Sequence, residues 1–235
     1  MKLVGVDRAR GAWLVVESNE RLQKLTLGIV EELTDYLRSL DGTECRVVVD
    51  VPIGLPVSEE RRVDKAARRL VGPKRSSSIF PVPMRSALAG RSYEEASARN
   101  FAVSGKKLSR QAYGILAGIR ELDEFVTPAR QEWLREGHPE VTFAMLSGGI
   151  VGMVAGKKTP EGVAARATQL GQYMTVPDVD EVRLNLGRRY AGPDDVLDAL
   201  AMLVSASRLW RGMAAILPDG EVQLDERGLR MEMVA

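Results

Sequence analysis

The amino-terminal part of the chain alternates between short apolar runs and polar turns. Two β-rich runs, residues 3–6 and 11–17, flank a tight connection, which predicts a β-hairpin. A weaker third strand is predicted over residues 22–27, where leucines recur. Residues 28–40 place apolar side chains at helical spacing, and residues 46–51 form a β-branched run typical of a strand buried on both faces. The predicted order is strand, strand, strand, helix and buried strand.

The pattern after residue 51 is mainly helical. Residues 130–136 fit a strand or a helix equally well, and weak alternation over residues 228–234 predicts a final edge strand. Because no repeat and no low-complexity linker interrupts the chain, we expect a single domain over residues 1–235, with a mainly helical insertion at about 57–128. Helices are expected at residues 59–71, 93–103, 111–125, 162–173 and 194–215, and a Ser/Pro loop at residues 76–83.

Composition narrows the class of protein and the chemistry open to it. Hydrophobic residues make up 45% and charged residues 28% of the 235 positions, which is typical of a globular domain. The one cysteine, Cys45, excludes a disulfide framework and a cysteine-rich zinc site. The one histidine, His138, leaves no spare imidazole for a Ser-His-Asp triad. Any catalysis is therefore expected to depend on carboxylates.

The distribution of apolar residues predicts in which cellular compartment the protein lies. An acid, Asp7, interrupts the amino terminus before a signal-peptide apolar region can form. The longest uncharged stretch, residues 141–156, is shorter than the ~20 residues needed to cross a bilayer. We therefore expect a cytoplasmic protein with no membrane partner.

Four aspartates stand where α/β proteins place ligands. Asp7 and Asp50 each end an apolar strand, and Asp195 and Asp198 share one face of the helix expected from residue 194. Carboxylate oxygens are the ligands that Mg²⁺ or Mn²⁺ prefers. Two such ions about 4 Å apart activate water and stabilise the leaving oxygen in phosphodiester cleavage. A simpler interpretation stays open for each acid, because aspartates also cap turns and helix starts.

Basic and glycine-rich segments offer sites for phosphate. Residues 61–75 hold seven basic residues against one acid, so a local patch exists in a chain whose net charge is only +1. Arg75 and Ser76 at its end combine guanidinium and hydroxyl donors, suited to a phosphate backbone or a small phosphorylated metabolite. A solvated helix face is the alternative. A phosphate loop at Gly156 is disfavoured, because Val151 and Lys158 stand where the Walker pattern needs Gly and Ser or Thr.

Several of these segments, taken together in order, resemble a known family. They are Val4–Asp7 with Gly11–Trp13, Asp50–Leu55, Gly105–Gln111, His138–Phe143 and Asp194–Ala199. The set resembles the predicted RNase H-like nucleases grouped as domain-of-unknown-function family four-two-nine, and it runs through nearly the whole chain. The resemblance implies an α/β, RNase H-like fold. Its mixed sheet of about five strands would carry helices on both faces and a helical insertion.

The resemblance also implies roles for individual residues. Asp7, Asp50 and one or both of Asp195 and Asp198 would bind the metal. His138 would orient a water or relay a proton, or else it bonds a backbone carbonyl in a turn. Glu140 would be a further carboxylate that binds the metal or acts as a general base. Lys157 and Arg166 would bind the substrate phosphate, or else they are basic surface residues that favour solubility. Asp50 departs from many RNase H-like nucleases, which have the longer Glu there.

The leading functional hypothesis is a divalent-metal-dependent nuclease or phosphodiesterase. Its catalytic set would be Asp7, Asp50, Glu140, Asp195 and Asp198, with Mg²⁺ or Mn²⁺ as cofactor and nucleic acid, DNA or RNA, as partner. Two alternatives keep the fold: a non-catalytic domain that binds nucleic acid or protein, and a phosphometabolite enzyme. The sequence leaves homo-oligomerisation open.

Overall fold

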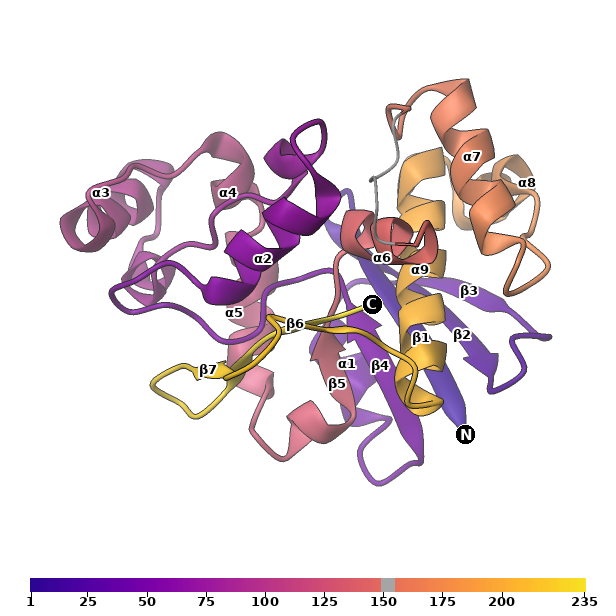
Figure 1. Cartoon of the computed structure of the whole chain (residues 1–235), viewed down its shortest axis with the longest axis horizontal. Helices are drawn as coiled ribbons and strands as arrows, with labels where there is room; N and C mark the ends of the chain where they lie inside the picture. The colour runs from indigo at the N-terminus through magenta and orange to yellow at the C-terminus, as the bar shows by residue number, and fades with distance from the viewer. Residues whose placement is uncertain (149–154) are drawn as a thin grey trace.

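A computed structural model describes residues 1–148 and 155–235. Its centre is a five-stranded sheet in the order β3-β2-β1-β4-β5 (Figure 1). The antiparallel pairs are β1–β2 and β2–β3, and the parallel pairs are β1–β4 and β4–β5, so the sheet is mixed. The strands are β1 (Lys2–Ala9), β2 (Ala12–Asn19), β3 (Thr26–Val30), β4 (Cys45–Val49) and β5 (Leu134–Glu136).

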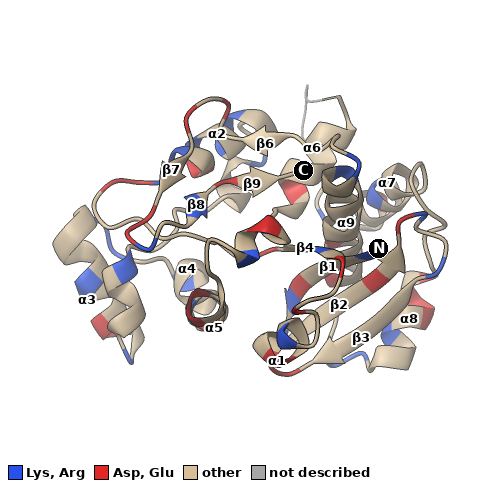
Figure 2. Ribbon diagram, turned by 90° about the horizontal axis from the view of Figure 1, so that it is seen from below, with Lys and Arg blue, Asp and Glu red and all other residues tan. Residues whose placement is uncertain are grey.

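Helices cover both faces of the sheet. Side chains alternate along each strand, so Leu3 and Val48 enter one core and Val4 and Val47 the other. The first core lies under α9, and α7 and α8 also pack against it, while the second lies under α1 and α5 (Figure 2). The bounds are α1 (Leu33–Arg38), α5 (Leu116–Phe125), α7 (Pro160–Leu170), α8 (Val179–Leu186) and α9 (Pro193–Trp210). The expected α/β fold is confirmed, and it is consistent with an RNase H-like fold.

The remaining elements lie beside the sheet (Figure 1). Between β4 and β5 come α2 (Arg62–Val71), the 3₁₀ turns η1 (Ser76–Ser78) and η2 (Arg85–Ala89), α3 (Tyr93–Ser104), α4 (Arg110–Gly114), α5 and the 3₁₀ turn η3 (Arg130–Glu132). After β5 comes α6 (Pro139–Leu146). The short strands β6 (Ile216–Leu217), β7 (Gln223–Leu224), β8 (Arg230–Met231) and β9 (Met233–Val234) end the chain.

The predicted element order is correct through β4, but several boundaries differ. Residues 28–30, expected in the first helix, belong to β3, because Val30 pairs with Trp13 and Gly28 with Val15. The carboxy-terminal segment is not an edge strand of the main sheet. Instead β8 pairs with β7 and β9 pairs with β6 in separate two-stranded sheets. Helices α6 and α8 were not predicted, since each is short and follows a proline or aspartate turn.

Two further findings bear on the expectations from sequence. Among residues 1–148 and 155–235, no helix is long and apolar enough to cross a membrane. Much of the glycine-rich segment considered as a phosphate loop falls within residues 149–154, outside the described residues.

Candidate active site

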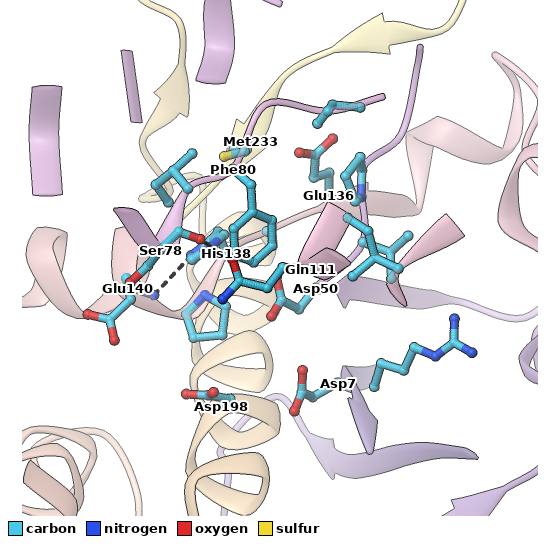
Figure 3. A pocket seen from close by; sticks show the side chains of 18 of the residues that line it. Asp7, Asp50, Ser78, Phe80, Gln111, Glu136, His138, Glu140, Asp198 and Met233 are labelled. Atoms are coloured by element: carbon cyan, nitrogen blue, oxygen red, sulfur yellow. Dashed lines mark hydrogen bonds between the residues drawn. The ribbon is translucent and has the colours of Figure 1, made fainter. Parts of the chain in front are cut away.

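A cavity of about 480 Å³ opens where β1, β4 and β5 end. The start of α6, one face of α9 and the segment after η1 complete its wall (Figure 3). Several acids line it from different elements: Asp7, Asp50, Asp195, Asp198, Glu136 and Glu140. The strand ends and the late helix therefore bring together the acids that the sequence singled out.

Asp7 and Asp50 are adjacent because their strands are parallel and in register. Val6 of β1 pairs with Val49 of β4, and the Asp50 N–H donates to the Val6 carbonyl over 2.9 Å. By the alternation of the strands, both aspartates point to the face that α9 covers. Asp7 is 6% exposed. Burial raises its pKa well above the usual value, and the negative charges of Asp50 and Asp198 raise it further.

A glycine lets α9 approach this end of the sheet. A Cβ atom on Gly5 would lie 2.2 Å from the Leu203 nitrogen and 2.3 Å from the Ala199 carbonyl oxygen. The α9 backbone therefore passes directly over β1, which brings Asp198 to the same end of the cavity as Asp7 (Figure 3).

Asp198 is buried beside a lysine. Its Oδ2 accepts a 2.8 Å hydrogen bond from Lys157 Nζ, whose distance to Asp194 Oδ2 is 3.7 Å. Burial raises the Asp198 pKa to about 7 against the opposing effect of Lys157. Burial alone would lower the pKa of Lys157, but Asp198 and its neighbours outweigh that effect and raise it. Asp198 Oδ1 has no hydrogen-bond partner in the part of the chain that the structure describes.

Asp195 lines the same cavity but has a structural partner. Its Oδ2 accepts a 2.7 Å hydrogen bond from the Gly192 N–H at the start of α9, which is one half of a capping box, because Gly192 has no side chain to supply the other half. Burial raises its pKa, although the Gly192 hydrogen bond opposes the shift. The capping interpretation thus describes Asp195 better than Asp198.

His138 caps α6 and holds the neighbouring loop. Its Nδ1 accepts from the Glu140 N–H over 3.2 Å, so the proton lies on Nε2, which donates to the Ser78 carbonyl over 3.3 Å. This arrangement matches the carbonyl-bonded alternative. Both ring nitrogens are used in positioning α6 against the segment that contains Ser78.

Glu140 and Arg166 form a buried ion pair, with Oε1 and Nη2 2.5 Å apart. Arg166 is completely buried and is not among the residues that line the cavity. Glu140 does line it, and its Oε2 has no hydrogen-bond partner among the described residues. Arg166 therefore orients Glu140, while Glu140 keeps one oxygen for another group.

Only some of the basic side chains of residues 61–75 lie on the surface. Arg61 is completely buried and bonds Glu136 over 2.6 Å, so it cannot bind an external phosphate. Arg75 donates to the Ala155 carbonyl, and Ser76 donates to the Pro73 carbonyl over 3.2 Å. Neither lines the cavity, whereas the next two residues, Ser77 and Ser78, do. The exposed bases of the segment are Arg62, Lys65, Arg69 and Lys74.

Sequence reasoning missed three features of the wall. Glu136 ends β5 as Asp7 and Asp50 end their runs, and the same strand-end signal would have found it had residues 134–136 been assigned as a strand. Burial raises the Glu136 pKa to about 7, with Arg61 opposing the shift. Phe80 and Gln111 also line the cavity. Phe80 carries no sequence signal, and Gln111 ends the Gly105–Gln111 segment of the family resemblance, which assigns it no role. The positions of both depend on how the segment between β4 and β5 folds back.

The donor set suits a hard divalent cation. Asp7, Asp50 and Asp198 offer carboxylate oxygens. Burial first, and then the charges of Asp50 and Asp198, raise the pKa of Asp7, and a cation would relieve that repulsion. The Oδ1 atom of buried Asp198, which has no hydrogen-bond partner among the described residues, is also suited to bind a cation. As arranged, no three acidic, histidine or cysteine side chains among the described residues already share one ion position. Lys157 supplies the positive charge there instead.

Fold and site together define an α/β protein with an acidic cavity at the carboxyl ends of a mixed sheet. The chain belongs to the family described as Protein of unknown function (DUF429), whose profile matches residues 5–223. No curated protein and no solved structure matches the chain significantly.

Proposed function

We propose that this protein is a divalent-metal-dependent hydrolase of phosphodiester bonds, acting on nucleic acid. The observation that carries the proposal is the meeting of Asp7, Asp50 and Asp198, from β1, the end of β4 and α9, at one cavity. Their charges are incompletely balanced by the protein, because Lys157 is the one base within bonding distance of Asp198 in the described structure. Mg²⁺ or Mn²⁺ bound there would activate water and stabilise the leaving oxygen.

The other residues would position the substrate and the ligands. Arg166 holds Glu140 through Oε1 and leaves Oε2 without a partner among the described residues, so this carboxylate of the cavity wall would accept a proton or bind the cation through water. His138 bonds the Ser78 backbone carbonyl and so would hold the segment that carries the Ser77 and Ser78 hydroxyls at the cavity wall. Lys157, half-exposed, would move from Asp198 to a substrate phosphate when a cation takes its place.

Cleavage assays with matched variants test the proposal. The protein would be incubated with Mg²⁺, Mn²⁺ or EDTA and with single-stranded, duplex, hybrid and branched DNA and RNA. We expect metal-dependent cleavage that Asp7→Asn and Asp198→Asn each abolish. Asp219→Asn, an exposed aspartate outside the cavity, should cleave as the wild type does. Cleavage that persists in Asp7→Asn would show that the activity comes from elsewhere.

Metal binding provides a second readout that needs no substrate. Calorimetric titration with Mg²⁺ or Mn²⁺ should show binding by the wild type and by Asp219→Asn, and a loss in Asp198→Asn. The Lys157–Asp198 ion pair favours one competing function, a domain that binds its partner without metal. Absence of both metal binding and cleavage would support that domain and contradict the hydrolase.

A further inference from the structure

The cavity has two chemically different ends. Asp7 and Asp198 lie at one end, and Phe80 and Met233 lie at the other (Figure 3). Cation and phosphate chemistry needs only the acidic end. The apolar side chains that line the cavity are Val51, Pro52, Ile79, Phe80, Val82 and Met233, and two further lining acids, Asp64 and Glu136, are both paired with Arg61. A ligand that fills the whole cavity must therefore have an apolar part as well as an anionic one.

Phe80 is the aromatic member of this wall, and it packs into no core cluster of the described residues. Ile79 and Met233 pack into one core cluster and Val51 and Val82 into another, but Phe80 belongs to none of them. It stays partly exposed, and it makes no ring or cation contact with another described residue. An aromatic face left open inside a cavity is a stacking surface for a flat, apolar ligand.

Gln111 adds a polar group that can read such a ligand. It lies in α4, is exposed, and lines the cavity with Phe80. Its amide makes no side-chain hydrogen bond to another residue of the described ranges, so a donor and an acceptor both remain for a ligand. Amide side chains pair with the edge of a nucleobase through this combination.

The size of the cavity suits a ligand of about one nucleotide unit. Its volume of about 480 Å³ falls in the range of small-molecule pockets. A base must leave its helical stack to enter a pocket of this size, as it does in enzymes that extrude one nucleotide.

We propose that the apolar end of the cavity binds a single unpaired nucleobase, stacked on Phe80 and read by Gln111, with its phosphate toward Asp7 and Asp198. Placing the phosphate rests on the proposed function, whereas the base site stands on the wall residues alone. The substrate class is then single-stranded or frayed nucleic acid, or a free nucleotide, in preference to continuous duplex.

Binding of small probes tests the base site apart from catalysis. Calorimetry would compare adenosine, adenosine monophosphate and ribose 5-phosphate, each with Mg²⁺ present. Phe80→Ala should weaken binding of the first two by about fivefold to 150-fold, the range expected for one base–aromatic stack, and leave ribose 5-phosphate unchanged. Phe101→Ala provides the matched control, because Phe101 on α3 is 51% exposed and lies outside the cavity. Phe80→Trp, which keeps a stacking face, should restore binding.

The outcomes separate this inference from the proposed hydrolysis. If wild type and Phe80→Ala bind adenosine and its monophosphate equally, or the wild type binds neither, the base site is refuted. Asp7-dependent cleavage that is indifferent to Phe80→Ala would refute it while the hydrolase stands. Phe80-dependent nucleotide binding without any cleavage would support the base site and contradict the hydrolase. Gln111→Ala should reduce discrimination among the four nucleoside monophosphates.

Discussion

Replacing Gly5 with alanine tests whether the contact between α9 and β1 assembles the site. The new Cβ would lie 2.2 Å from the Leu203 nitrogen, whereas ordinary van der Waals contact starts at 3.4 Å. The gap must therefore open by about 1.2 Å, given these two distances. The obstructing atoms belong to the helix backbone, so no side-chain rotation relieves them. Either α9 moves away from the sheet or the strand bends.

The expected cost follows from the behaviour of overpacked cores. Such insertions cost about 1–3 kcal/mol and occasionally more, and a backbone clash belongs at the upper end of this range. For a domain of this length each kcal/mol lowers the melting temperature by about 2–4 °C, so a decrease of about 6–12 °C is expected. Displacement of α9 also separates Asp198 from Asp7, which should weaken cation binding more than the stability loss alone explains.

Thermal unfolding in EDTA, followed by circular dichroism, measures the stability effect, and Mg²⁺ titration measures the site. Gly28→Ala in β3 is the matched control, because its Cβ would meet no atom within 4 Å. That change should be neutral or stabilising by about 0.4–1 kcal/mol, through the lower chain entropy of the unfolded state. Equal melting temperatures for the two variants would refute the argument that Gly5 sets the position of α9.

The remaining predictions concern buried charge. Arg61→Met leaves Glu136 without its partner and should cost about 3–5 kcal/mol, whereas Arg62→Met, which removes an exposed arginine, should change stability by less than about 0.5 kcal/mol in urea unfolding. Equal effects would contradict a buried ion pair. The pKa of Asp7 in the folded protein lies above its usual value of 3.8, so folding favours the protonated carboxyl. The free energy of unfolding therefore decreases as the pH rises from 3.8 to the folded-state pKa. Asp7→Asn in EDTA should therefore melt above the wild type at neutral pH, with the difference vanishing below about pH 3.8; melting curves that coincide at every pH would contradict this.

Local pattern predicted the order of the elements through β4, because most runs of residues 1–51 have one clear period. The hairpin, the third strand and the buried strand are specified by neighbours in sequence. The pattern failed at residues 28–30, where pairing with β2 outweighs helical spacing. It also failed at residues 228–234, where partners at residues 216–217 and 223–224 decide the pairing. These choices depend on contacts between distant segments.

By itself the sequence determined where chemistry is to be expected. With one cysteine and one histidine, any catalysis is expected to depend on carboxylates, and strand ends and helix spacing indicated Asp7, Asp50 and Asp198. Only the tertiary structure decided which charges are available, because burial and partners are properties of the packed chain. In the folded chain Arg61 and Arg166 are buried in ion pairs, and Lys157 forms an ion pair with Asp198. Phe80 lines the cavity. The physical reason is that a charge or an aromatic ring acquires its role from what surrounds it in space.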